Sequence, residues 1–322
     1  IFQHLTYPAQ DANKIAQYLR EYGHFEVNLL PEIFSGDKLE IDKMGIVQQE
    51  ILRNKISTLF NPQETNYPQT ALLYFSGHGL LKSLSNDKQE GYLASSDSHI
   101  KKDKYGISFN WLSEVLINSP ISELIIWLDC CYSGDFIDLI SQKINFNNVQ
   151  KKNQRIWFIA SCRALEVAYG LNNHGLFTQL LLEGLNPYQN NAGEWINSKT
   201  LDAIIDDQLK NDPNLSTFGQ RFPSFTFGEP IYFWQKLGVN AIPKEYIPLQ
   251  NLLASAQWKE ANKLTRKMIL EVVKREKEGW LTDEQIQNFP WEVLEIINKL
   301  WLKYSDGYFG FSVQKQIFIQ CG

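Results

Sequence analysis

Short apolar runs alternate with amphipathic stretches along the first 234 residues. Apolar runs bounded by polar turns predict strands at 71–75, 124–128 and 155–162, and the segment FEVNLL predicts another at 25–30. Apolar residues at helical spacing predict helices over 11–22, which Gly23 ends, over 43–59, and from His174 onward. Alternation of strands with helices is typical of an α/β domain, so we predict a mostly parallel sheet flanked by helices.

The pattern changes near residue 234. The segment PSFTFGEPIYFW at 223–234 predicts a closing strand, and 235–247, with two prolines and no clear period, predicts a linker. Residues 248–322 are helical in pattern and rich in charged and aromatic residues. We therefore expect two domains, an α/β domain over 1–234 and a small all-α domain over 248–322.

Composition and charge argue against several classes of protein. The net charge is −5 and lysines are interspersed with acids, so no basic face for nucleic acid is expected. No apolar run approaches the roughly 18 residues of a membrane span, and the start lacks the pattern of a secretion signal. Four cysteines, two of them adjacent, do not form a disulfide framework. These features predict a soluble cytoplasmic protein with reduced thiols. Because the chain begins without Met close to a helical pattern, we also expect that its native N-terminus is missing.

Candidate chemistry lies in two polar turns. His78 stands in SGHG after the strand at 71–75, and Cys131 stands in DCCYSG after the strand at 124–128. Ligands in such sheets bind beyond the carboxyl ends of the strands, and a thiol with a pKa of about 8.5 needs a nearby base to attack a carbonyl. The alternatives are a loop histidine without a role and two small apolar residues that end a core strand. Together at two strand ends, the pair favours nucleophilic catalysis.

The alternation of side chains along a strand predicts which of the two adjacent cysteines is the reactive one. Successive side chains point to opposite faces, so Asp129 and Cys131 share one face and Cys130 takes the other. We expect Cys130 to pack in the core, provided that the extended conformation continues to Cys131.

These motifs resemble those of the caspase-like cysteine peptidases, in the form found in metacaspases and their bacterial relatives. YFSGHG at 74–79 resembles the family's His motif, and Asp129, Cys131, Ser133 and Gly134 match its D-x-C-x-S-G pattern. ASCRALEVAYG and HGLFTQLLLEGL resemble later segments, and the resemblance covers about residues 1–232. It implies that Cys131 is the nucleophile and His78 the general base. It also implies a strand before the helix at Asp11, which this chain lacks.

The resemblance further implies a preference for basic substrates. In metacaspases an aspartate two residues before the Cys and another in an N-D-A motif form an acidic pocket for Arg or Lys. Those positions match Asp129 and Asp11, although Gln10 stands where the family often has Asn. We expect cleavage after Arg or Lys. The alternative for Asp11 is a helix N-cap, a common role for Asp.

The expected mechanism needs no cofactor. Backbone N–H groups of Gly79 and Cys131 are the expected oxyanion donors, and His78 would return its proton to the leaving amine. Calcium control through Asp97, Asp135 and Asp138 is a weaker hypothesis, because solvated loop acids explain these residues better. Self-cleavage is expected in the polar segment 141–155, whose basic residues are Lys143, Lys151, Lys152 and Arg155, with Lys151 and Lys152 the main candidates.

The C-terminal part resembles the GUN4 domain, a helical tetrapyrrole-binding module of oxygenic phototrophs. The matching residues are Trp258, Ala261, Thr265, Trp280, Phe289, Pro290, Leu300, Trp301, Tyr304, Ser305 and 309–314. Asn262 and Asn298 depart from it, since the family more often has Asp there. The resemblance implies a truncated domain that could take a porphyrin, although many of these aromatic residues could equally form its core.

Two functions compete. The leading hypothesis is an endopeptidase acting on proteins or peptides with a basic residue before the scissile bond, with a GUN4-like sensor that regulates it. The alternative is a weakly active caspase-like scaffold in which the second domain binds a tetrapyrrole and does the work.

Overall fold

The fold was analysed in a computed structural model. It describes residues 5, 7–35, 38–63, 67–85, 88–144, 153–161, 170–171, 174–189, 191–211, 222–238 and 242–321. The chain forms two compact units, Ile1–Gly238 and Val239–Gly322, which are described separately.

A four-stranded sheet in the order β12-β8-β7-β3 forms the centre of the first unit. Its strands are β3 (Thr70–Ser76), β7 (Glu123–Asp129), β8 (Arg155–Ala160) and β12 (Ser224–Phe227). β3, β7 and β8 are parallel, and β12 joins β8 in the antiparallel sense. The predicted α/β class and mostly parallel sheet are confirmed.

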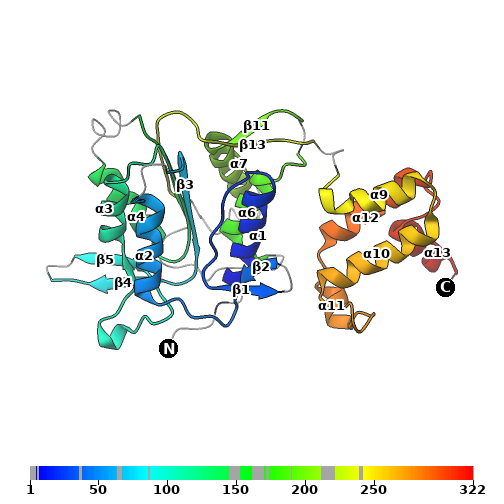
Figure 1. Ribbon diagram of the computed structural model, residues 1–322, viewed down its shortest axis with the longest axis horizontal. Helices are drawn as coiled ribbons and strands as arrows, with labels where there is room; N and C mark the ends of the chain where they lie inside the picture. The colour runs from blue at the N-terminus through cyan, green and yellow to red at the C-terminus, as the bar shows by residue number, and fades with distance from the viewer. Residues whose placement is uncertain are drawn as a thin grey trace. The chain divides into compact units, whose positions relative to one another are not determined.

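Apolar side chains of the sheet point alternately into two cores. On one face Leu124, Ile126 and Leu128 pack among residues of α2, α3 and α4. On the other face Ile125 and Trp127 pack among residues of α1, α6 and α7. Figure 1 shows α2, α3 and α4 on one side of β3, with α1 and α6 on the other. A strand buried on both faces reads as a continuous apolar run, which is why its position could be predicted.

The first unit also contains helices and smaller sheets around these strands in the sequence. The helices are α1 (Pro8–Glu21), α2 (Gln49–Phe60), η1 (Ile100–Lys102), α3 (Phe109–Ile117), α4 (Ser133–Lys143), α6 (Leu176–Leu185) and α7 (Ser198–Asn211). Two-stranded pairs are β1 (Glu32–Ser35) with β2 (Lys38–Ile41), β9 (Gly170–Leu171) with β10 (His174–Gly175), and β11 (Trp195–Asn197) with β13 (Tyr232–Gln235). A three-stranded sheet contains β4 (Gly79–Ser83), β5 (Gln89–Leu93) and β6 (Ile107–Ser108).

Three predicted elements differ from the structure. Residues 25–30 pair in no described ladder; instead the amide of Phe25 donates to the carbonyl of Leu19, and the guanidinium of Arg20 donates to the carbonyl of Val27 at 3.0 Å. The single closing strand is two strands in different sheets, separated by a bend that contains Gly228 at φ +82°.

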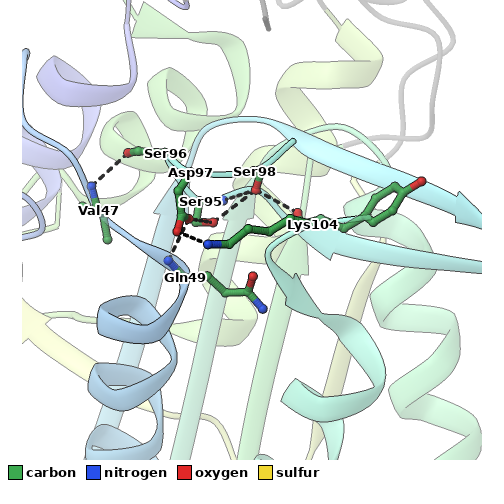
Figure 2. Close-up of polar contacts among 8 residues, drawn as sticks. Val47, Gln49, Ser95, Ser96, Asp97, Ser98 and Lys104 are labelled. Atoms are coloured by element: carbon green, nitrogen blue, oxygen red, sulfur yellow. Dashed lines mark hydrogen bonds and ion pairs between the residues drawn. The ribbon is translucent and has the colours of Figure 1, made fainter. Parts of the chain in front are cut away.

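The third difference is the start of α2, which begins at Gln49 and not near Lys43. As Figure 2 shows, the carboxylate of Asp97 accepts the amide hydrogen of Gln49 at 2.9 Å, and the Ser96 hydroxyl oxygen accepts that of Val47. The Ser96 amide donates in turn to the carbonyl of Val47. A loop distant in sequence therefore holds residues before the helix in a non-helical path and caps its N-terminus.

The second unit is helical. It contains η2 (Lys244–Tyr246), α9 (Ile247–Ala254), α10 (Trp258–Val272), α11 (Asp283–Gln287), α12 (Trp291–Tyr304) and α13 (Phe311–Cys321). Leu249 and Leu253 of α9, Ala261 of α10, and Ile297 and Leu300 of α12 form its buried core. None of the helices in the described ranges has the length and apolar character needed to cross a membrane.

Candidate active site

The two predicted turns meet at one edge of the sheet. Ser76 and Asp129 are opposite one another in the parallel register, so β3 and β7 end together. The amide of Gly77 donates to the carbonyl oxygen of Asp129 at 3.1 Å. A Cβ added to Gly79 would lie 1.8 Å from the carbonyl oxygen of Cys131. The backbones of the two turns are thus in contact, and His78 and Cys131 lie on adjoining turns.

The adjacent cysteines have different surroundings. Cys130 is buried in the core, whereas Cys131 is exposed. β7 ends at Asp129, Tyr132 has φ +61°, and α4 begins at Ser133. The extended conformation that the pleat argument assumed therefore ends before Cys131, so that step of the reasoning was wrong. The turn that replaces it still leaves Cys130 packed and Cys131 accessible.

Ser133 ties this turn to the sheet. Its Oγ lies 2.7 Å from the carbonyl oxygen of Cys130 and 2.5 Å from that of Ser161, which follows β8. Cys130 follows β7 and Ser161 follows β8, so the hydroxyl of the first residue of α4 links the segments that leave these two strands. The residue matches the Ser of the D-x-C-x-S-G pattern, and its contacts give that position a structural reason.

The local environment keeps the Cys131 thiol protonated. Burial raises the pKa of Cys131, and the neighbouring Asp129 carboxylate raises it further, against a backbone hydrogen bond that lowers it. A thiol with a raised pKa is a poor nucleophile until a base removes its proton. His78, the predicted base, is half-buried on the adjoining turn.

The two predicted pocket aspartates converge on Gly175. The amide of Gly175 donates to Oδ2 of Asp11 at 3.2 Å. A Cβ at Gly175 would lie 2.9 Å from Oδ2 of Asp129 and 3.3 Å from Oδ2 of Asp11. Asp11 is 1% exposed in the first turn of α1, whose N-cap is Tyr7, so the N-cap alternative for Asp11 was wrong.

The surroundings of Asp129 disfavour the ionised form of its carboxyl group. Burial raises its pKa to about 6 and the nearby Asp11 contributes to the rise, although a hydrogen bond from Thr178 opposes it. The Thr178 hydroxyl donates to Oδ2 of Asp129 at 2.6 Å and lies 2.7 Å from the Tyr74 hydroxyl. Two acids held together in low dielectric attract a cation strongly. Sequence reasoning missed Thr178 and Tyr74, whose only signal was their place within the two resembling segments.

The aspartates predicted to bind calcium, Asp97, Asp135 and Asp138, lie in two different parts of the fold. Asp97 caps α2, accepts a hydrogen bond from Ser95 and pairs with Lys104, as Figure 2 shows. Asp135 and Asp138 lie on α4. Among the residues that the structure describes, no group of three or more His, Cys, Asp or Glu side chains could hold a metal ion.

Of the four residues predicted as self-cleavage sites, two lie within the described part of the chain and two outside it. Lys151 and Lys152 lie outside the described residues. Lys143 ends α4 and donates to Asn110 and Ser113, and Arg155 begins β8 and pairs with Glu123. Residues held in a helix or strand are poor cleavage sites, because the chain must locally unfold to enter a peptidase.

Three of the aromatic residues that suggested the second domain, Trp258, Trp301 and Tyr304, are partly buried and pack against its core. The indole Nε1 of Trp301 donates to Thr265 Oγ1 at 3.0 Å. The rings of Trp258, Trp301 and Phe309 pack with centroids 5.5–6.1 Å apart. Phe309, Trp280 and Tyr308 are 47%, 59% and 77% exposed.

Comparison with known families agrees with both halves of this arrangement. The family model of the caspase domain matches residues 2–207, well over half of the chain. The chain belongs to the caspase-domain family. The model of the GUN4-like family matches residues 240–322. A caspase-family domain is therefore followed by a GUN4-like helical region.

Curated relatives match only part of the chain. The Ycf53-like protein of Synechocystis is 35% identical over 80 residues, 24% of this chain and 34% of that protein. The chloroplastic tetrapyrrole-binding protein of Arabidopsis thaliana is 32% identical over 77 residues, 22% of this chain and 28% of that protein. The chain thus spans about a third of these relatives' length. A solved protein of Geobacter sulfurreducens, 15% identical with a TM-score of 0.36 over 59% of this chain and 78% of that one, is too distant to support an argument.

Proposed function

We propose that this caspase-family chain is a cysteine endopeptidase that cleaves after Arg or Lys, with Cys131 as nucleophile and His78 as general base. The observation that carries the proposal is the contact between the two turns beside a pair of converging carboxylates. A thiol, an imidazole and an acidic pocket at one sheet edge are the groups that such a reaction requires.

The proton moves first. His78 takes the proton of Cys131, whose raised pKa makes this step necessary. The thiolate then forms a bond to the substrate carbonyl carbon, the C–N bond breaks, and His78 gives its proton to the leaving amine. Water hydrolyses the thioester, with His78 again accepting a proton, and restores the thiol.

The amides of Gly79 and Cys131 are the proposed oxyanion donors. Ala94 donates to the carbonyl of His78 at 3.0 Å, and Gly79 is opposite Leu93 in the next pair of the antiparallel ladder. Hydrogen-bonded and non-hydrogen-bonded pairs alternate, so the Gly79 amide points away from β5. The proposal is supported by the close approach of the two backbones, since a Cβ added to Gly79 would lie 1.8 Å from the carbonyl oxygen of Cys131.

Asp129 and Asp11 are the proposed specificity groups. Their convergence leaves negative charge that an Arg or Lys side chain would neutralise, and charge-assisted hydrogen bonds are worth roughly 1.5–3 kcal/mol each. Asp129→Asn should therefore lose Arg peptides first. Unchanged selectivity would show that another group forms the pocket.

Peptides ending in Arg–fluorophore and Asp–fluorophore test the proposal. The intact chain should release the fluorophore from Arg and not from Asp. Cys131→Ala should abolish turnover, while the matched Cys130→Ala keeps most of it. If neither peptide is cut with or without millimolar calcium, the alternative of a scaffold without peptidase activity stands.

We also propose that the GUN4-like unit binds a tetrapyrrole and thereby regulates the peptidase. The support is the match over 240–322, together with the exposed Trp280 and Tyr308, because exposed aromatic side chains suit a flat apolar ligand. Saturable quenching of tryptophan fluorescence by a porphyrin is expected. Quenching that does not saturate would refute tetrapyrrole binding. Saturable quenching without any change in peptide turnover would support binding and refute regulation of the peptidase.

A further inference from the structure

Asp129 is reached by a chain of two hydroxyl groups that come from separate elements. Tyr74 is on β3 and Thr178 is in the first turn of α6. The Tyr74 hydroxyl lies 2.7 Å from Thr178 Oγ1, and Thr178 Oγ1 lies 2.6 Å from Oδ2 of Asp129. Thr178 is fully buried, so water does not replace these contacts.

The direction of these hydrogen bonds follows from proton counting. An ionised carboxylate only accepts, and a threonine hydroxyl has one proton. While Asp129 is charged, that proton points to Asp129, so Thr178 can only accept from Tyr74. Burial, Asp129 and Asp11 together raise the pKa of Tyr74 well above its ordinary value, so the phenol stays protonated and able to donate.

We infer that Thr178 and Tyr74 are positioning residues that hold Asp129 as an oriented anion in the basic-substrate pocket. The inference rests on the proposed function of that pocket. It adds that Thr178 and Tyr74, through their hydroxyl groups, determine the pH above which the pocket is charged. Without this chain of donors, burial and the Asp11 charge would favour the protonated acid, which cannot pair with a guanidinium.

Few other ionisable groups face this carboxylate in the described part of the chain. Asp11 approaches from α1 and Tyr74 from β3, and Cys130 and Cys131 follow Asp129 in the turn after β7. Thr178 of α6 and Ser161 after β8 are uncharged donors. Removing the Thr178 hydroxyl therefore removes a stabilising donor and leaves the neighbouring charges in place.

The test compares two peptides that differ in charge and hardly in shape, one with Arg and one with citrulline before the scissile bond. The ratio of their kcat/KM values cancels the pH dependence of the chemical step, which both reactions share. In the native chain the ratio should rise with pH through about 6, where Asp129 ionises. Thr178→Val should move this midpoint up by about one pH unit, a tenfold loss of selectivity below it that high pH restores. Thr178→Ser, which keeps the hydroxyl, should leave the midpoint in place.

A merely structural role predicts a different result. Both peptides would then be cut more slowly at every pH with the midpoint unchanged, and that outcome would overturn the inference. If Thr178→Val does not fold, Tyr74→Phe decides by the same criterion, with a smaller upward move. Failure of the native chain to cut either peptide would instead count against the proposed function. In that case the carboxyl ¹³C shift of Asp129 gives its midpoint without catalysis, and a midpoint equal in native and Thr178→Val chains would refute the inference.

Discussion

Gly79 is the position where one methyl group should most damage the candidate site. The ideal Cβ of Gly79→Ala lies 1.8 Å from the carbonyl oxygen, 2.7 Å from the carbonyl carbon and 3.2 Å from the nitrogen of Cys131. All three are backbone atoms, so no side-chain rotation relieves the overlap. Real Cβ atoms essentially never come within 3.0 Å, and the two turns must therefore separate by at least about 1.2 Å.

This separation sets the size of the effect. The atoms that move carry the two proposed oxyanion amides, and a misplacement of about 1 Å can cost about a hundredfold in rate. Loss of one such donor costs about 100- to 1,000-fold. We expect kcat/KM for the Arg peptide to fall at least about 100-fold, although His78 and Cys131 are unchanged. The strain should also lower the unfolding free energy by about 1–3 kcal/mol.

Gly77→Ala is the matched control in the same turn. Its nearest atoms are in the ring of Phe75 at 3.1 and 3.3 Å, and a ring can move aside. Alanine also keeps the amide that donates to Asp129. Peptide turnover should stay within a few-fold of the native rate, with thermal melts to confirm that both variants fold. Native activity in Gly79→Ala, or an equal loss in both variants, would refute the reasoning.

Three further predictions concern stability. Burial raises the pKa of Asp202 to about 6, against a hydrogen bond from the Trp157 indole, so its ionisation weakens the fold as pH rises from about 4 to 6. Asp202→Asn should gain up to about 2 kcal/mol relative to the native chain over that window in urea titrations, and a constant difference would contradict this. Burial also raises the pKa of Asp97, but Lys104, Ser95 and the Gln49 amide outweigh it and hold the value at about 2, so Asp97 stabilises the fold above about pH 4 and loses this effect as pH falls towards 2. Asp97→Ala should cost about 0.5–2 kcal/mol at pH 7 and little at pH 2. Thr265→Val leaves the Trp301 indole without its acceptor and should cost about 1–3 kcal/mol in thermal melts, whereas Thr265→Ser should cost much less.

The residue types of the candidate site could be recognised from the sequence, but their arrangement could not. His78 and Cys131 stand in turns that follow apolar runs, which is a local pattern. The contact between Gly79 and Cys131 depends on parallel pairing of strands about fifty residues apart. Thr178 reaches Asp129 only because α6 packs on the same face of the sheet as α1. Neither relation leaves a mark in the spacing of residues along the chain.

The sequence by itself determined the three parallel strands, the helices α1 and α6, the greater part of α2 and the helical character of the second unit, because a strand buried on both faces and a helix buried on one must show their periods in the chain. Tertiary contacts decided the local structure at three places where the periodic pattern of the sequence did not. Asp97 and Ser96 delay the start of α2, Arg20 and Leu19 take up backbone groups of residues 25–30, and the turn after Asp129 overrides the pleat at Cys131. At α2 the partners are remote in sequence, and at residues 25–30 they lie at the end of the preceding helix; in both places they satisfy backbone groups that the local pattern had assigned elsewhere. At Cys131 the chain turns because α4 begins at Ser133.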